Sequence, residues 1–338
     1  MSHQRSYRAW MLVLLTTLLL LPLAASAAPQ TLRLGQAQPY NFVAFANADL
    51  HQQSLPVQHA VVLVHGVKRN ADDYYTSGQA LLQNAGLDAS NTLLITPNFL
   101  TQSDRRAGDD MPLWAKDKWM HGTESQSGRT GIAAFTVLDD LLAYLADRQR
   151  FPQLKDILFI GHSAGGQLMQ RYTLLGDGDQ RLKGTGIVMR YVVSSPSSYL
   201  YVDDNRLQDG AFKPVLTIMC PSYNRYRYGL ERAPAYFTRQ ALSTQQVLQR
   251  YAAREVTFMV GQRDNNPRDR VMDASCGAEM QGDTRVERQL NYVRYDRFLA
   301  QKWAIPIEHR QFEVNGIGHN AARLFKAKSV AEDLFPTR

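Results

Sequence analysis

The sequence predicts an α/β fold in which helices cover both faces of a mostly parallel sheet. Short apolar runs recur along the chain, and most are continuous rather than alternating, as expected for strands that are covered on both sides. Helical patterns lie between these runs. A serine flanked by glycines follows one of the runs, at a point where a strand must turn sharply into a helix.

Six apolar runs are the candidate strands of this sheet: residues 60–66, 91–99, 156–163, 189–196, 255–264 and 308–316. Residues 130–150 predict a helix between the second and third runs. The apolar stripe of this helix consists of Ile132, Phe135, Leu138, Leu142 and Leu145. Before residue 60 the signals are weaker, and residues 31–36 (TLRLGQ) predict an antiparallel strand at the edge of the sheet.

The first 27 residues are typical of a signal peptide, which leaves residues 28–338 as one domain. Arg5 and Arg8 precede a long apolar stretch, and small residues at 25–27 fit a cleavage site. The alternative is an uncleaved anchor helix, since the apolar stretch is about long enough to span a bilayer. We expect cleavage, and a mature protein in the periplasm or outside the cell without a stable membrane partner.

Residues 197–252 interrupt the alternation of predicted strands and helices, and they are rich in tyrosine, arginine and proline. We interpret them as a cap-like insertion over the strand ends. Seven tyrosines lie between positions 191 and 236. They are expected either to form an aromatic wall of a substrate pocket or to be ordinary core and surface residues.

Two cysteines, Cys220 and Cys276, lie in the part of the chain that we expect to be exported. An even pair in an oxidising compartment predicts one disulfide. Two buried free thiols are the alternative. The pair is too small for a structural zinc site, and no histidine pattern supports one, so no metal is expected.

The formal net charge of +7 could suggest an anionic partner. The basic residues are scattered, however, with no run of five or more and no zinc or helix-turn-helix spacing. We therefore expect a solvated surface and no nucleic-acid partner.

The stretch GHSAG, residues 161–165, has the pattern G-x-S-x-G. A strand that ends at Ile160 and a helix that begins near Ala164 would force Ser163 into a strained turn. The chain then approaches itself closely on both sides, and only glycine at 161 and 165 leaves room. This nucleophile elbow, which spans Gly161, His162 and Gly165, would lift the Ser163 hydroxyl above the sheet edge.

A nucleophilic serine needs a base within hydrogen-bond reach and an acid that orients the base. In hydrolases with this elbow the chain order is serine, acid, histidine. The histidines that follow Ser163 are His309 and His319. We favour His319, because two glycines place it in a loop just after a strand, whereas His309 falls inside that strand.

Asp264 is the expected acid, because it ends an apolar strand and enters a turn marked by Asn-Asn-Pro. Asp273, Asp283 and Asp296 are alternatives, but none of them directly follows a strand signal. The expected role of Asp264 is to hold the tautomer of His319 and to stabilise the imidazolium that forms when the serine proton is taken.

Two backbone N–H groups are expected to form an oxyanion hole. One belongs to Ala164, the residue after the nucleophile, and the other to Val67, in the loop after an early strand where Gly66 lets the backbone turn. His65 precedes the serine, against the expected order, so we interpret it as shaping this loop. Arg69 and Asn70 are expected to be structural.

Four stretches, LVHGVKRN, GHSAGG, VGQRD and GIGHN, occur in an order and spacing that resemble the α/β-hydrolase superfamily over most of residues 58–325. The chain also resembles exported bacterial and fungal α/β-hydrolases related to esterases and polyester depolymerases. That likeness lies in HGVKRNADDYY, PNF, RYVVSSPSSYLY, CPSYNRYRYGL and ASCGAEMQGDTR. The resemblance implies the same triad and oxyanion donors. The sequence departs from the lipase pattern H-G-G-G, since a single glycine follows His65.

Together these features predict an exported serine hydrolase that cleaves small or polymeric carboxylic esters through an acyl-enzyme, without a cofactor. A peptidase or an acyltransferase on the same fold would use the same triad, so the sequence leaves both open. A non-catalytic binding module is a weaker alternative, because a binding protein has no need of all three triad residues.

Overall fold

The computed structural model describes residues 28–216, 218 and 220–336. The expected signal peptide, residues 1–27, therefore lies outside the described residues. In the part of the chain that is described, no helix has both the length and the apolar character needed to cross a membrane.

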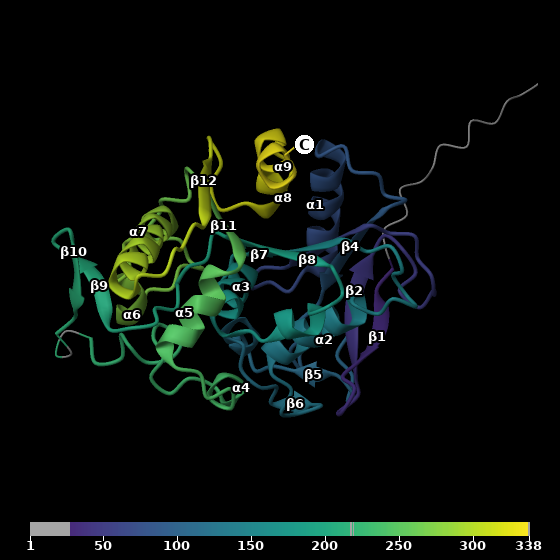
Figure 1. Cartoon of the computed structure of the whole chain (residues 1–338), viewed down its shortest axis with the longest axis horizontal. Helices are drawn as coiled ribbons and strands as arrows, with labels where there is room; N and C mark the ends of the chain where they lie inside the picture. The colour runs from purple at the N-terminus through teal and green to yellow at the C-terminus, as the bar shows by residue number, and fades with distance from the viewer. Residues whose placement is uncertain (1–27, 217, 219, 337–338) are drawn as a thin grey trace, which may run out of the picture.

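An eight-stranded sheet in the order β1-β2-β4-β3-β7-β8-β11-β12 forms the centre of the molecule (Figure 1). Its strands are β1 (Gln30–Leu34), β2 (Tyr40–Ala46), β3 (His59–Val64), β4 (Thr92–Pro97), β7 (Asp156–His162), β8 (Val188–Ser194), β11 (Glu255–Gly261) and β12 (Arg310–Val314). Neighbours from β4 to β12 pair in parallel, and β2 pairs antiparallel with both β1 and β4. The expected parallel sheet and antiparallel edge strand are confirmed, and β2 is a strand that the sequence did not lead us to expect.

Helices cover both faces of this sheet, also as expected. They are α1 (Ala71–Asn84), α2 (Ala134–Leu145), α3 (Ala164–Leu175), α4 (Ala235–Thr238), α5 (Thr244–Ala252), α6 (Cys276–Glu279), α7 (Arg285–Trp303), α8 (Ala321–Phe325) and α9 (Lys328–Leu334). Shorter elements are η1 (Lys118–His121), η2 (Gly178–Leu182), β5 (Pro112–Leu113), β6 (Ser127–Gly128), β9 (Asn205–Gln208) and β10 (Ala211–Pro214). Figure 1 shows α1, α8 and α9 on one face and α2 and α3 on the other.

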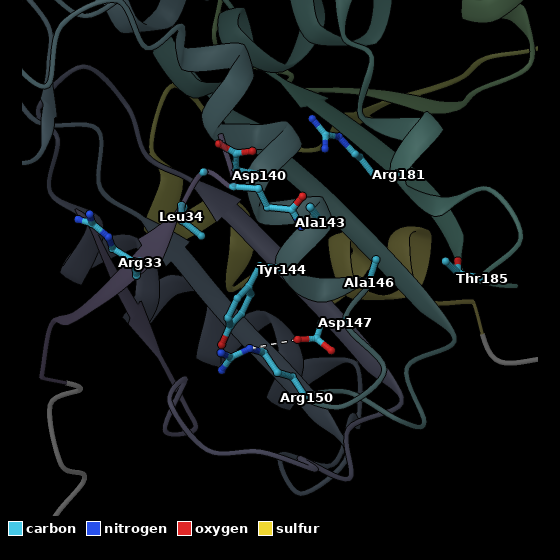
Figure 2. Close-up of a pocket in the computed structure, with 12 residues that line it drawn as sticks. Arg33, Leu34, Asp140, Ala143, Tyr144, Ala146, Asp147, Arg150, Arg181 and Thr185 are labelled. Carbon is cyan, nitrogen blue, oxygen red and sulfur yellow. Dashed lines mark ion pairs between the residues drawn. The ribbon is translucent and has the colours of Figure 1, made fainter. Parts of the chain in front are cut away.

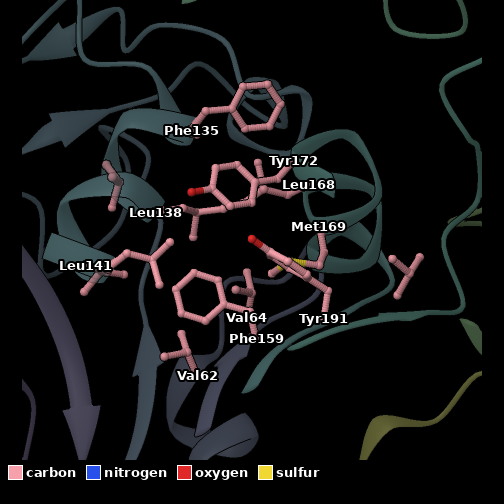
Figure 3. Packing of buried hydrophobic residues seen from close by; sticks show 14 of the residues in the cluster. Val62, Val64, Phe135, Leu138, Leu141, Phe159, Leu168, Met169, Tyr172 and Tyr191 are labelled. Carbon is pink, nitrogen blue, oxygen red and sulfur yellow. The ribbon is translucent and has the colours of Figure 1, made fainter. Parts of the chain in front are cut away.

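Successive residues of an inner strand point to opposite faces of the sheet, and each face has its own hydrophobic core. This explains why the apolar runs are continuous. In β3, Val62 and Val64 join the larger core with α2, α3, α5 and α7, whereas Val61 and Leu63 join the smaller core with α1, α8 and α9. Figure 3 shows the larger core, where Phe159 of β7 lies among side chains of α2 and α3. Both faces of a strand are thus removed from water, and an apolar residue is favoured at every position.

Residues 197–252 hold the hairpin β9–β10, the short helix α4 and the helix α5. Helix α5 packs against α3 and leads into β11, so the last part of the segment belongs to the helical layer of the sheet. A disulfide joins Cys220 of this segment to Cys276, the first residue of α6, as expected.

The tyrosines of this segment are largely core residues. Tyr199 and Tyr201 are buried, and their ring centroids lie 4.6 and 5.3 Å from that of Tyr292 in α7. Tyr223 and Tyr228 are also buried. Of the two expectations for these side chains, the structure favours packing in the core over an aromatic pocket wall.

Candidate active site

Ser163 lies at the turn between β7 and α3, at the carboxyl edge of the parallel strands. Its φ of 59° is in the left-handed region, which costs a serine on the order of 1–3 kcal/mol. The Ser163 N–H donates to the carbonyl of Ser194 at 2.9 Å, and the Ser163 carbonyl accepts from the Gln167 N–H at 2.9 Å. These bonds hold the strained turn. Ala164 begins α3, so its N–H has no acceptor within the helix.

The two glycines of the elbow stand where one backbone segment passes another. A Cβ on Gly161 would lie 2.1 Å from the carbonyl oxygen of Gly165, and a Cβ on Gly165 would lie 2.5 Å from that of Val64. Both distances are far below van der Waals contact. A side chain at either position would push α3 away from the sheet and move the serine with it.

We expect Gly161→Ala to lower the free energy of unfolding by about 3 kcal/mol, because the added methyl group meets backbone atoms that cannot rotate away. Thermal unfolding measures this loss. Gly108→Ala is the matched control, since its Cβ would have no neighbouring heavy atom closer than 3.7 Å. Equal melting temperatures for the two variants would contradict the close approach at the elbow.

The side chains of Ser163, Asp264 and His319 meet at this edge of the sheet. Nε2 of His319 lies 2.9 Å from Oγ of Ser163, and Nδ1 of His319 lies 2.7 Å from Oδ2 of Asp264. The Asp264 side chain is 3% exposed and that of His319 is 14% exposed. The acid follows β11 and the histidine follows β12, and these two strands pair in parallel, so their carboxyl ends lie together.

Hydrogen bonds between the two loops continue this pairing beyond the strands. The Gln262 N–H donates to the carbonyl of Val314 at 2.9 Å, and the Arg263 N–H donates to that of Ile317 at 2.8 Å. The acid and the base are therefore carried by one hydrogen-bonded unit, which limits changes in the distance between them.

The residues considered as alternatives for the acid and the base pair with other residues or lie at the surface. His309 lies just before β12, and its Nδ1 is 3.0 Å from Oδ2 of Asp296, with both side chains buried. Asp273 accepts hydrogen bonds from Arg227 and a tyrosine hydroxyl, each at 2.8 Å. Asp283 is exposed ahead of α7. None of these four side chains forms a hydrogen bond with Ser163 in the described residues.

The loop after β3 brings Val67 to the same cavity as Ser163. The buried ring of His65 accepts from the Phe99 N–H at Nε2 (3.0 Å), so its Nδ1 carries the proton and donates to the Gly66 carbonyl at 2.8 Å. Burial lowers the pKa of His65 to about 4, so the ring is neutral near neutral pH and keeps one nitrogen as donor and the other as acceptor. Because the N–H of a trans peptide points opposite to its carbonyl, the bond turns the Val67 N–H away from the His65 ring.

Tyr74 and Arg285 are polar neighbours of the site that the sequence did not reveal. The Tyr74 hydroxyl lies 2.8 Å from Nδ1 of His162, whose ring stacks on that of His319 with centroids 4.9 Å apart. Burial lowers the pKa of His162 well below its ordinary value, so this neighbour is uncharged. Arg285 donates to Asp264 at 3.0 Å. Both contacts join residues far apart in the chain, so no local pattern could have identified them.

Two cavities flank Val67. The first, of about 420 Å³, contains Ser163 and His319 and is also lined by residues of α1 and α8. The second, of about 640 Å³, is lined by Trp114, Lys116 and the segment 101–103 among others. The described residues of 197–252 line neither cavity.

A third cavity, of about 540 Å³, is lined by residues of β1 and α2 together with Arg181 and Thr185 among others, and Ser163 is not one of them (Figure 2). Its charges are partly paired: Nε of Arg150 lies 3.3 Å from Oδ2 of Asp147, and Tyr40 donates to Asp140 at 2.8 Å. The described residues that line it include no serine, cysteine or histidine, and the Thr185 hydroxyl donates to the Leu182 carbonyl at 2.7 Å. This hydroxyl is therefore not bonded to a basic side chain of the cavity.

The sequence matches no protein-family model and no curated protein. The structure is similar to that of LpqC, a poly(3-hydroxybutyrate) depolymerase from Bordetella parapertussis, with a TM-score of 0.62 and 18% identity over 92% of this chain and 90% of that chain. It is also similar to poly(aspartic acid) hydrolase-1 from Sphingomonas sp. KT-1, with a TM-score of 0.60 and 16% identity over 91% of this chain and 98% of that chain. Identities this low show a shared fold, and the activity must be argued from the site.

Proposed function

We propose that this chain, which has the α/β-hydrolase fold, is an exported serine hydrolase that cleaves carboxylic esters. The observation that carries the proposal is the hydrogen-bonded series from Ser163 through His319 to Asp264, at 2.9 and 2.7 Å. A serine on a strained turn, an imidazole bonded at both nitrogens and a buried carboxylate are the parts that nucleophilic catalysis requires.

The proposed reaction has two stages. In the first, Oγ of Ser163 bonds to the ester carbonyl carbon while its proton passes to Nε2 of His319. The carbon–oxygen bond to the alcohol then breaks, and His319 returns the proton to the departing alkoxide, which leaves an acyl-enzyme. In the second stage His319 takes a proton from water, the hydroxide bonds to the acyl carbon, and the acid departs as Ser163 regains its proton.

The N–H groups of Ala164 and Val67 are the proposed donors to the oxyanion that forms in each stage. Their contribution is large where it has been measured in such sites, about 10²–10³-fold in kcat for a single donor. Support for Ala164 comes from its position at the start of α3. Support for Val67 comes from the bond between His65 and the Gly66 carbonyl, and from the cavity that Val67 shares with Ser163.

The cavities on either side of Val67 have room for a substrate that extends beyond the reacting ester. The two similar structures carry the names of enzymes that act on polymers, one on the polyester poly(3-hydroxybutyrate) and the other on the polyamide poly(aspartic acid). Both names support a polymeric or oligomeric substrate, and the first supports an ester linkage. The disulfide between Cys220 and Cys276 supports export, since such bonds persist in oxidising compartments.

A substrate panel tests the proposal. The purified protein is incubated with p-nitrophenyl esters of increasing acyl length, with soluble ester oligomers and with matched p-nitroanilides. We expect ester cleavage, a higher kcat/KM for acyl chains longer than acetyl because of the open cavity, and no measurable amide cleavage. Faster cleavage of anilides would support a peptidase instead, and transfer to an added alcohol in preference to water would support an acyltransferase.

A further inference from the structure

A buried cation contacts the acid of the proposed triad. Arg285, the first residue of α7, has a side chain that is 1% exposed. Its Nη1 donates to Oδ1 of Asp264 at 3.0 Å and to Oδ2 of Asp269 at 3.1 Å, and its Nη2 donates to the Val271 carbonyl at 3.1 Å. Asp264 therefore uses one carboxylate oxygen for Arg285 and the other for His319.

We propose that Arg285 is a positioning residue that holds the carboxylate of Asp264 toward His319. The inference rests on the proposed function, since it concerns the acid of the same triad. Arg285 forms no hydrogen bond with Ser163 in the described part of the chain, and it acts through the acid.

The contacts at both oxygens of Asp264 explain how its carboxylate is positioned. A carboxylate that is hydrogen-bonded through only one oxygen can rotate about its Cβ–Cγ bond, but contacts at both oxygens fix its plane. The planar guanidinium is itself held by the carbonyl of Val271 and by its place at the start of α7. Arg285 thus ties the loop 264–271 to α7 and keeps Oδ2 of Asp264 pointed at His319.

Asp269 helps to hold Arg285 in place. Its carboxylate is 25% exposed and accepts from Arg285 and from the Val271 N–H, the latter at 3.0 Å. Burial acts to raise its pKa, but these hydrogen bonds and the charge of Arg285 bring the pKa below the ordinary value, so Asp269 is ionised at neutral pH. Nη1 of Arg285 thus donates to two carboxylates, and the second of them helps to fix the guanidinium that holds Asp264.

The test is a comparison of kcat and KM for a p-nitrophenyl ester, with the active fraction measured by fluorophosphonate titration. Arg285→Met should lower kcat per active site by about tenfold and leave KM nearly unchanged, because the acid is less well held while the cavity is untouched. Arg285→Lys keeps the charge but cannot bond two acceptors through a planar group, so its kcat should lie between those of Arg285→Met and the wild type. Asp269→Asn should lower kcat by a smaller factor.

A loss in kcat per active site at an unchanged KM, partly restored in Arg285→Lys, is the decisive result, because general loosening of the site would raise KM as well. A wild-type kcat per active site in Arg285→Met, or a KM that rises in proportion to the loss, would overturn the proposal. If Arg285→Met does not fold, Arg285→Lys decides alone: a lower kcat at an unchanged KM supports the proposal, and a wild-type kcat refutes it. A wild-type protein without ester hydrolysis would instead refute the proposed function.

Discussion

Replacement of Ser163 by alanine is expected to lower kcat/KM for ester hydrolysis by about 10⁴- to 10⁶-fold. The hydroxyl is the atom that bonds to the acyl carbon, and no other group lies within hydrogen-bond distance of Nε2 of His319 in the described part of the chain. The fold should survive, because the backbone at Ser163 is held by main-chain bonds to Ser194 and Gln167. Initial rates on a p-nitrophenyl ester measure the loss.

Ser90→Ala is the matched control, since Ser90 is exposed in the loop before β4. It should hydrolyse the ester at the wild-type rate. Retention of more than about a tenth of the wild-type kcat/KM in Ser163→Ala would mean that another group attacks the substrate, and the elbow would then be structural.

Replacement of His319 by glutamine is expected to lower kcat/KM by about 10⁴-fold. Glutamine preserves a polar side chain of similar reach, but it cannot take the proton from Ser163 at neutral pH. Asp264 and Arg285 remain paired in this variant, so the unfolding temperature should change little. The same ester assay measures the loss, together with the rate at which a fluorophosphonate reacts with Ser163.

His51→Gln serves as its control, because His51 is exposed and distant from the elbow in the chain. A His319→Gln variant that keeps wild-type activity would show that a different base serves the serine. His309 would then be the first residue to examine, although it is bonded to Asp296 in the structure.

The sheet could be predicted from the sequence because each of its inner strands buries both faces, and a continuous apolar run is the signature of that environment. Strand β2 was not expected, although it is apolar and almost entirely buried. Its partners are set by contacts across the sheet, such as the pairing of Ala46 with Ile95, and these contacts have no local signature. The similarity of the whole structure to the two solved hydrolases confirms the α/β-hydrolase fold that the motifs implied.

The candidate site was predictable where its residues carry a local signal. The elbow has a short motif because the strain at Ser163 and the close approach at Gly161 act within a few residues. The chain order then limited the choice of acid and base. Arg285 could not be predicted, because its contact with Asp264 depends on how the start of α7 packs against the loop after β11. The tyrosines of 197–252 were ambiguous because the same side chain suits a pocket wall and a core.

The site at which a fluorophosphonate forms its covalent adduct tests most directly whether Ser163 is the nucleophile. We expect one adduct, on the peptide that contains Ser163, which forms rapidly in the wild type, slowly in His319→Gln and not at all in Ser163→Ala. Equal labelling of Ser163→Ala and the wild type, or an adduct on a different residue, would contradict this assignment.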